Sequence, residues 1–375
     1  MKKILFIIHE ASATGAPFVI DNLLKSSYFA KNECFVLSIY GGELENDLKN
    51  NAQLSILYKK AQRNFLKKVK HKFFFQNEYL KLLNNGFFDL VYINSVASLT
   101  RMPTLDFLKK NKCILHVHEG PVLIENLGAK DLLENEINKF SKLIFVSHFV
   151  KEALISKYEI DTSKFKVIPP VIRNLNYSES ELNLLKFNKN SFVVCSTGSM
   201  NYIKGVDVFL QIAKNVINKA DISRPIFFKW IGTKGSAEIR NHTLDDLMKM
   251  ELEKNVEFLP NTDSIISYFI ESDVFLLSSR EESFSMVAME NAMLGNPVVC
   301  FDKGNGTKEF INNENGYIVP YMDINAASNA ILEMYNDTEL LKKKSEAIKK
   351  MSIQFSGDDT ANQIFDLIDE VIDGK

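Results

Sequence analysis

Two glutamates carry the strongest chemical signal in the sequence, because they flank the start of one predicted helix. The segment 278–297 follows a strand-like run and ends in Gly-Asn-Pro; its helix is expected to begin near Ser285, with Ser283 or Ser285 as the capping residue. The free amides and the positive dipole end of such a helix suit an anion such as a diphosphate. Glu282 precedes the helix and Glu290 lies about 7 Å along it. Two carboxylates could therefore hold hydroxyls on both sides of the phosphates, although an arbitrary pair of this kind is more often a solvated acid and a capping acid.

A lysine-glycine pair, Lys204 and Gly205, opens a second predicted helix after a strand end and a turn at Gly198. A lysine at such a helix start offers its positive charge to a leaving diphosphate. Alone, it would be explained more simply as an exposed lysine, but the glutamate pair favours a functional role for Lys204.

Two loops in the first half of the chain add further candidates. The segment 12–17 joins the first predicted strand to a helix, with Gly15 near the cap and Pro17 in the first turn. The chain lacks a Gly-x-Gly-x-x-Gly pattern at this point, which argues against a nicotinamide-dependent dehydrogenase. His116 and His118 share one face of another strand end, so a metal pair is conceivable, but the sequence shows no third ligand.

All of these residues follow short apolar runs that alternate with helical stretches, the signature of a parallel sheet covered on both faces. The runs are 4–8, 34–39, 90–93, 113–117, 143–146 and 166–168, and then 192–196, 226–231, 256–259, 274–277 and 298–301. The predicted fold class is α/β, with two Rossmann-like domains facing each other across a cleft. Because open α/β sheets bind ligands beyond the carboxyl ends of their strands, we expect the ligand in that cleft.

The expected domain boundaries follow from a break in this pattern. A chain of 375 residues exceeds one ordinary core, and the pattern weakens between residues 169 and 189. We expect an N-terminal domain over 1–172, a C-terminal domain over 173–355, and a terminal helix over 356–375 that packs back on the first domain.

Composition excludes several classes of function. The formal net charge of −2 gives no electrostatic reason to bind nucleic acid. The apolar run of the first strand is too short for a signal peptide or a membrane span, so a cytoplasmic location is expected. Four dispersed cysteines in apolar runs are interpreted as reduced core residues.

The segment 58–75 contains seven Lys or Arg residues and no acid, with Phe65, Val69 and Phe73 at four-residue spacing. This pattern is typical of a basic amphipathic helix on an anionic membrane face. A solvated helix whose aromatic stripe joins the core explains it equally well. The first interpretation would place the protein peripherally on the inner face of the cytoplasmic membrane.

The segment around the glutamate pair resembles the signature of the retaining GT-B glycosyltransferases of family 4, a Glu, seven residues and a second Glu. The resemblance implies that Glu282 binds hydroxyls of the donor sugar and Glu290 the ribose hydroxyls. It also implies that amides around Phe284, Ser285 and Met286 meet the phosphates.

The lysine-glycine turn resembles the same family over residues 196–207, where Gly198 and Lys204 match its phosphate-binding turn. In the family an arginine often joins this lysine, but Ser199 occupies its commonest position here. Arg280 or Lys234 could take over its role.

The loops of the first domain match more loosely. Gly15 corresponds to the family's first glycine loop, and the resemblance assigns a histidine near residue 118 to the donor sugar, for which we choose His118. Glycines in 304–309 and 315–317 resemble a later loop and turn of the family, and they serve either ligand approach or plain turns.

The resemblance implies a retaining glycosyltransferase that moves a hexose-type sugar from a UDP- or GDP-sugar to a glycan or lipid-linked acceptor, as in surface polysaccharide or glycoconjugate synthesis. The first domain would be the acceptor side and the second the nucleotide-sugar side. No cofactor is expected. The chain has no Asp-x-Asp, so we expect front-face substitution without a metal, the leaving diphosphate being stabilised by Lys204 and helix amides.

Two alternatives remain open. A sugar-nucleotide epimerase or a phosphorylase of the same two-domain fold also needs a phosphate site. A noncatalytic partner subunit could bind nucleotide and scaffold an active glycosyltransferase, and Ser199 in place of the arginine keeps this alternative open.

Overall fold

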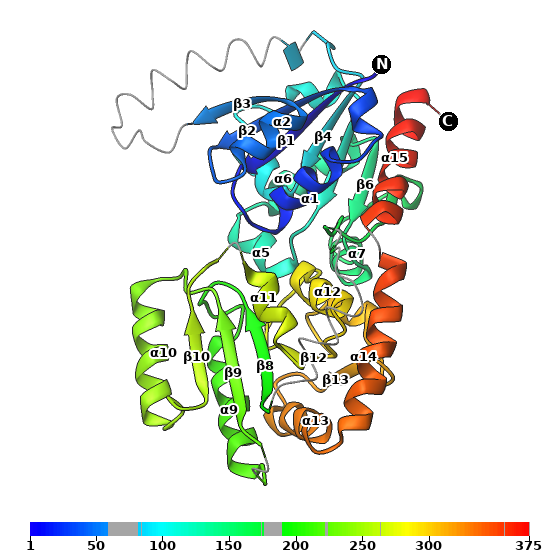
Figure 1. Cartoon of the computed structure of the whole chain (residues 1–375). Coiled ribbons are helices and arrows are strands. Elements are labelled where there is room, and N and C mark those ends of the chain that lie inside the picture. Colours follow the sequence, from blue (N-terminus) through cyan, green and yellow to red (C-terminus); the bar gives the residue numbers. More distant parts are fainter. Residues whose placement is uncertain are drawn as a thin grey trace. The chain divides into compact units, whose positions relative to one another are not determined.

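The computed structural model describes residues 1–58, 82–83, 85–173, 175, 190–221, 224–262, 264–355 and 357–374 (Figure 1). The chain divides into two compact units, Met1–Arg173 with Ser356–Lys375, and Asn174–Phe355. The predicted basic helix over 58–75 lies outside the described residues, except for Tyr58.

Unit 1 is built on a seven-stranded sheet whose paired strands all run parallel, in the order β3-β2-β1-β4-β5-β6-β7. The strands are β1 (Lys3–Glu10), β2 (Glu33–Tyr40), β3 (Gln53–Tyr58), β4 (Leu90–Asn94), β5 (Cys113–Val117), β6 (Lys142–Phe145) and β7 (Phe165–Val167). Its described helices are α1 (Gly15–Leu24), α2 (Glu45–Asn51), α4 (Val96–Arg101), α5 (Pro121–Asn126), α6 (Lys130–Glu136), α7 (His148–Ile155) and α15 (Gly357–Asp373).

The last helix belongs to unit 1 although it ends the chain. Phe365 of α15 stacks on Tyr28 with ring centroids 4.3 Å apart, and Lys2 pairs with Asp369 at 2.8 Å. The sequence predicts that this helix packs on the first domain. In the structure these contacts attach it to unit 1.

Unit 2 repeats the architecture with a six-stranded parallel sheet in the order β10-β9-β8-β11-β12-β13. The strands are β8 (Phe192–Thr197), β9 (Ile226–Ile231), β10 (Val256–Leu259), β11 (Val274–Leu277), β12 (Val298–Phe301) and β13 (Gly316–Val319). Its described helices are α9 (Val206–Lys219), α10 (Ala237–Lys249), α11 (Ile265–Ile270), α12 (Met286–Met293), α13 (Ile324–Asn336) and α14 (Thr338–Ser352).

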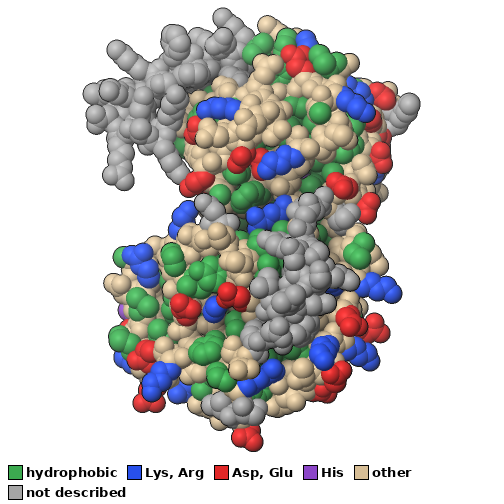
Figure 2. Space-filling view, in the orientation of Figure 1, with side chains coloured by type: hydrophobic (Ala, Val, Ile, Leu, Met, Phe, Trp, Pro, Cys, Tyr) green, Lys and Arg blue, Asp and Glu red, His purple; other side chains and the backbone are tan. Residues whose placement is uncertain are grey.

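The predicted fold class is confirmed, since both units are Rossmann-like parallel sheets with helices. Two strands were absent from the prediction, β3 and β13, and both lie at a sheet edge. Edge strands are covered on fewer sides, so they lack the continuous apolar run that marks a buried parallel strand. On the face that Figure 2 draws, basic and acidic side chains are interspersed over both units, as the small net charge suggests.

The four cysteines are core residues. All four cysteines, Cys34, Cys113, Cys195 and Cys300, are buried and free of disulfides. Burial raises the pKa of Cys34, Cys113 and Cys300 to about 12, which keeps these thiols protonated and unreactive. Within the described ranges, no helix combines the length and apolar character needed to cross a membrane.

Each sheet has a point where the strand order reverses, between β1 and β4 in unit 1 and between β8 and β11 in unit 2. The connections that follow the two strands at such a point run in opposite directions, which opens a crevice beyond the carboxyl ends of these strands. The residues singled out in the sequence follow these strands or their neighbours.

The turn before α9 depends on one glycine. Gly205 has φ +67°, and a Cβ there would lie 2.1 Å from the carbonyl oxygen of Ser278. We expect Gly205→Ala to destabilise the protein by more than the roughly 1–3 kcal/mol of a strained backbone alone, because it also meets a fixed carbonyl. The measurement is urea denaturation.

Gly15→Ala is the matched control, because a Cβ at Gly15 meets nothing within 4 Å. Its stability should stay within about 1 kcal/mol of the parent. Equal stabilities for the two variants would show that the close approach at Gly205 does not constrain the turn.

Candidate functional site

The strongest candidates of unit 2 converge beyond β8 and β11. Lys204 comes from the loop after β8 and Glu282 from the loop after β11, and the Lys204 Nζ lies 2.6 Å from the Glu282 Oε2. Ser279 Oγ donates a second hydrogen bond to the same oxygen at 3.3 Å. The side chains are 32% and 12% exposed, so the pair lies at the surface of the crevice and can be reached by a ligand.

The glycine turn shapes the path of this lysine. Gly198 has φ +149°, and a Cβ there would lie 3.2 Å from the Cγ of Lys204. The indole Nε1 of Trp230 donates to the carbonyls of Gly198 and Gly232, at 3.1 and 3.0 Å. The single tryptophan of the chain therefore fixes the turn over which Lys204 passes.

A glycine-containing loop holds Glu282 from the other side. The Glu282 amide donates to the Gly304 carbonyl, and the Gly306 amide donates to the Glu282 carbonyl, both at 2.8 Å. Gly304 has φ +66°, and a Cβ there would lie 2.6 Å from the Arg280 carbonyl. Gly304 and Gly306 therefore let their loop pack closely against the backbone around Glu282.

The start of α12 is capped as predicted. Ser285 is the capping residue, its Oγ accepting from the Ala288 amide at 3.2 Å, and the helix begins at Met286. The Ser285 amide donates to Thr307 Oγ1 at 2.9 Å, so within this structure it serves the loop. The Phe284 side chain packs on Phe310, with ring centroids 5.7 Å apart.

Glu290, the second glutamate of the pair, lies in the same helix and is buried, with 5% of its surface exposed. A carboxylate so placed can reach a ligand only where the ligand enters the crevice beside α12.

Arg280 and its neighbours form a separate arrangement. The guanidinium makes two hydrogen bonds to the Asp207 carboxylate at 2.9 and 2.7 Å, and it lies 3.9 Å from the ring centroid of Tyr202. Burial pushes the pKa of Asp207 upward, but the bonds to Arg280 outweigh this and hold the pKa below its ordinary value. Arg280 thus braces the turn before α9, whereas Ser199 and Lys234 are exposed.

In unit 1, Asn94 links His118 to the residue after Gly15, the other candidate of the first half. The Asn94 Nδ2 donates to the Ala16 carbonyl at 2.7 Å, and its Oδ1 lies 2.8 Å from the His118 Nε2. The Oδ1 can only accept, so the His118 Nε2 carries the proton and Nδ1 is the acceptor. Asn94 therefore sets both the start of α1 and the orientation of the imidazole.

His116 in β5 and His118 just after it stay neutral. Burial lowers the pKa of His118 to about 3, and nearby His9 adds to this. Burial also lowers the pKa of His116, whose Nδ1 lies 2.8 Å from the Tyr92 hydroxyl. Their rings are 4.0 Å apart, but no group of three His, Cys, Asp or Glu side chains suited to a metal occurs among the residues described.

A buried carboxylate holds the neighbouring loops. Glu119 accepts from the amides of Val96, Ala97 and His118 at 3.0, 2.9 and 3.1 Å. Burial raises the pKa of Glu119 despite these hydrogen bonds, which favour its charged form. The carboxylate ties the start of α4 to the loop that bears His118.

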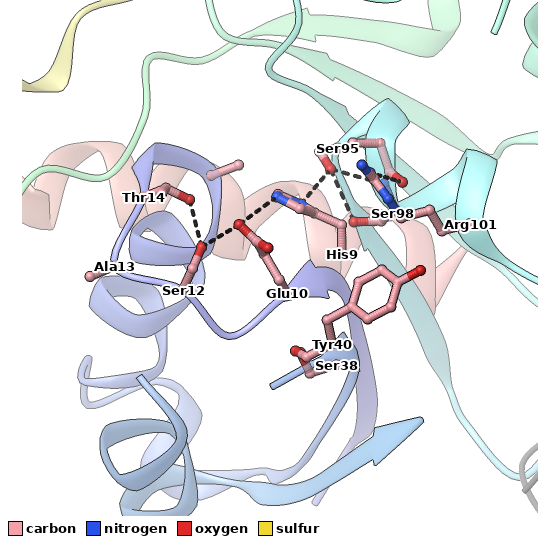
Figure 3. Close-up of polar contacts among 12 residues, drawn as sticks. His9, Glu10, Ser12, Ala13, Thr14, Ser38, Tyr40, Ser95, Ser98 and Arg101 are labelled. Atoms are coloured by element: carbon pink, nitrogen blue, oxygen red, sulfur yellow. Dashed lines mark hydrogen bonds and ion pairs between the residues drawn. The ribbon is translucent and has the colours of Figure 1, made fainter. Parts of the chain in front are cut away.

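A polar chain runs along the end of β1, as Figure 3 shows. Thr14 Oγ1 lies 2.9 Å from Ser12 Oγ, and Ser12 Oγ donates to Glu10 Oε1 at 2.6 Å. On the other side, His9 Nδ1 lies 3.3 Å from Ser95 Oγ. Ser95 has φ +98°, a conformation unusual for a residue other than glycine.

Several residues of these sites were missed in the sequence. Asn94, Trp230, Asp207 and Thr307 act by hydrogen bonds to partners far along the chain, and neither spacing nor local pattern marks such partners. The lone tryptophan at a strand end was the one available signal.

Comparison with known proteins adds the family. Residues 191–337 match the family model described as glycosyl transferases group 1. An uncharacterized glycosyltransferase of Methanocaldococcus jannaschii is 25% identical over 244 residues, which is 64% of this chain and 63% of that protein. The D-inositol 3-phosphate glycosyltransferase of Corynebacterium urealyticum is 25% identical over 178 residues, 47% of this chain and 42% of that protein. The chain thus spans about half the length of the curated relatives it matches.

Solved structures share the fold along the whole chain. HepE of Anabaena, in complex with UDP-glucose, superposes with a TM-score of 0.81 at 19% identity, covering 99% of this chain and 100% of that one. Sucrose-phosphate synthase of Thermosynechococcus elongatus gives a TM-score of 0.76 at 17% identity and covers 100% of both chains. The chain thus has the GT-B fold of two Rossmann-like domains, and its second domain, over residues 191–337, is similar to the group 1 glycosyltransferases.

Proposed function

We propose that this protein is a retaining, metal-independent glycosyltransferase of family 4 type that transfers a sugar from a nucleoside-diphosphate sugar to a glycan or lipid-linked acceptor. The observation that carries the proposal is the convergence of Lys204 and Glu282, at 2.6 Å, beyond the strand-order reversal of the group 1 domain. One cation and one carboxylate there suit the two halves of such a donor, its diphosphate and its sugar hydroxyls.

In this proposal the donor replaces an existing ion pair. The Lys204 ammonium turns from Glu282 to the diphosphate, where it stabilises the negative charge that develops as the sugar leaves. Glu282 then accepts hydrogen bonds from sugar hydroxyls, and Glu290 holds the ribose. Arg280 keeps its bonds to Asp207, so Lys204 binds the diphosphate without the arginine that often joins it in the family.

Two features of unit 1, Gly15 in its first loop and His118 after β5, support a role in binding the donor. A Cβ at Gly15 would meet nothing within 4 Å, and this glycine has an ordinary φ, so packing within the described chain does not require it. The absence of a side chain there leaves backbone open to a ligand. His118, neutral and with a fixed tautomer, suits a hydrogen bond to a sugar hydroxyl.

The proposal places the substitution on one face of the sugar, so that the new bond keeps the configuration of the old one. It includes no cofactor and no metal, because Lys204 and the α12 amides supply the stabilising charge. UDP is the first nucleotide to test, since HepE was solved with UDP and with UDP-glucose. A protein that binds UDP or GDP but turns over no sugar nucleotide would instead be a noncatalytic subunit.

The ion pair leads to opposite predictions for the two glutamates. Glu282→Gln frees Lys204, and UDP has no sugar for Glu282 to bind, so this variant should bind UDP roughly two- to fivefold more tightly, the scale of a partly exposed ion pair. Glu290→Gln loses a charge-assisted bond to ribose and should bind UDP about ten- to a hundredfold more weakly. Isothermal titration with UDP and GDP measures both.

Weaker UDP binding in Glu282→Gln would show that the carboxylate does not compete for Lys204. Unchanged affinity in Glu290→Gln would remove it from the nucleotide site. If the parental protein binds neither nucleotide, the proposed function is wrong.

Removing the lysine should affect turnover most. Lys204→Ala is expected to lower kcat about a hundredfold or more, because the ammonium meets charge that is larger in the transition state than in the bound donor. The donor Kd should rise less. The assay is hydrolysis or transfer of the sugar nucleotide that binds most tightly, with EDTA present because no metal takes part.

Lys249→Ala, on the exposed face of α10, is the matched control and should keep the parental rate. A parental rate in Lys204→Ala would show that another residue stabilises the leaving diphosphate. Activity abolished by EDTA and restored by manganese would contradict the metal-free step.

A further inference from the structure

A row of three side chains crosses the carboxyl edge of the unit 1 sheet. Glu10 at the end of β1 is in register with Tyr40 of β2, and Tyr40 is in register with Tyr58 of β3. The two tyrosine rings lie 5.6 Å apart at 35°, and Tyr40 is 38% exposed. The edge therefore presents an aromatic face directly beside a carboxylate.

The carboxylate faces an imidazole across a gap. Glu10 Oε1 lies 3.9 Å from His9 Nε2, which is too long for a hydrogen bond, and the two side chains are 31% and 17% exposed. Figure 3 shows the Glu10 carboxylate and the His9 imidazole turned toward each other, with the Tyr40 ring nearby. Ser12 holds Glu10 and Ser95 holds the far nitrogen of His9, so both groups are oriented before any ligand arrives.

These groups suit a hydroxyl. A hydroxyl both donates and accepts, so it can donate to the Glu10 carboxylate and exchange a second hydrogen bond with the imidazole. Burial lowers the pKa of His9, which keeps the ring neutral near pH 7 with one donor and one acceptor nitrogen. An exposed ring beside polar groups offers the flat apolar surface on which the C–H face of a pyranose can lie.

Charge decides between a neutral and an anionic ligand. Two carboxylates lie after strands at this end of the sheet, Glu10 at the end of β1 and Glu43 in the loop after β2, whose Oε2 accepts from the Ala13 amide at 3.3 Å. Arg101 is the cation that acts on His9, and its Nη1 is bonded to the Ala97 carbonyl at 2.8 Å. Among the residues that the structure describes here, two acids against one engaged guanidinium disfavour a phosphate-bearing group.

We propose that His9, Glu10 and Tyr40 form a subsite for a neutral pyranose ring, the sugar end of the acceptor, with the ring stacked on Tyr40 and a hydroxyl held between Glu10 and His9. This inference rests on the proposed function. It assigns the acceptor a class, a neutral glycan end, in preference to a phosphorylated one.

The test is saturation-transfer NMR on the full chain with saturating UDP. The probes are the methyl glycosides of glucose, galactose and mannose at millimolar concentration, and inorganic phosphate is the competitor. We expect saturation of at least one glycoside, reduced about fivefold or more in Tyr40→Ala and Glu10→Gln and retained in Tyr40→Phe, which keeps the ring. Thermal unfolding checks that each variant is folded.

Two controls locate the signal. Tyr321→Ala removes a comparably exposed tyrosine of unit 2 and should leave glycoside saturation unchanged. Glu282→Gln removes the carboxylate proposed for the donor sugar, so it separates glycoside bound at the donor site from glycoside bound at Tyr40. Loss of the signal in Glu282→Gln would assign it to the donor site and overturn the inference.

Equal saturation in the parent, Tyr40→Ala and Glu10→Gln would also overturn it, as would displacement of the glycoside by phosphate. A parental protein that binds UDP but no glycoside contradicts the subsite and leaves the proposed function intact. A parental protein that binds no nucleotide contradicts the proposed function, whether or not a glycoside binds.

Discussion

The arrangement of the second domain depends on how closely two loops approach each other. Gly205 lies against the Ser278 carbonyl at a distance that admits no side chain, and this contact joins the loop after β8 to the loop after β11. Ser278 Oγ also bonds to the Lys204 carbonyl at 3.2 Å. Because the backbones touch, the side chains that follow them converge, and Lys204 meets Glu282 although 78 residues separate them.

The first domain joins its loops by side chains. Glu119 and Asn94 tie the loops after β4 and β5 to each other and to the start of α1, using a buried carboxylate and an amide. A network of this kind is rigid because each buried group is costly to leave unpaired. The two crevices thus repeat one topology but use different local chemistry, which agrees with the absence of a second lysine-glycine turn in the first half.

Much of the architecture could be predicted because buried parallel strands are written as continuous apolar runs. The edge strands β3 and β13 could not, since Ser55 interrupts one and the other opens with Gly316, where a Cβ would lie 2.4 Å from the Val298 carbonyl. The sequence also identified Lys204 and Glu282 as candidate site residues, through their resemblance to the motifs of a glycosyltransferase family. Their mutual ion pair, and the use of Arg280 as a brace on Asp207, depend on three-dimensional contacts that no spacing encodes.

The same ion pair has a consequence for selectivity under the proposed function. A ligand that offers only phosphates can take Lys204 from Glu282, but it leaves a carboxylate that is 12% exposed with Ser279 as its remaining described side-chain partner. A partly buried charge that loses its partner is destabilised. A sugar nucleotide supplies hydroxyls that replace the lysine, so it satisfies both groups at once. The pair therefore favours the complete donor over the nucleoside diphosphate that remains after transfer, which promotes product release without any further residue.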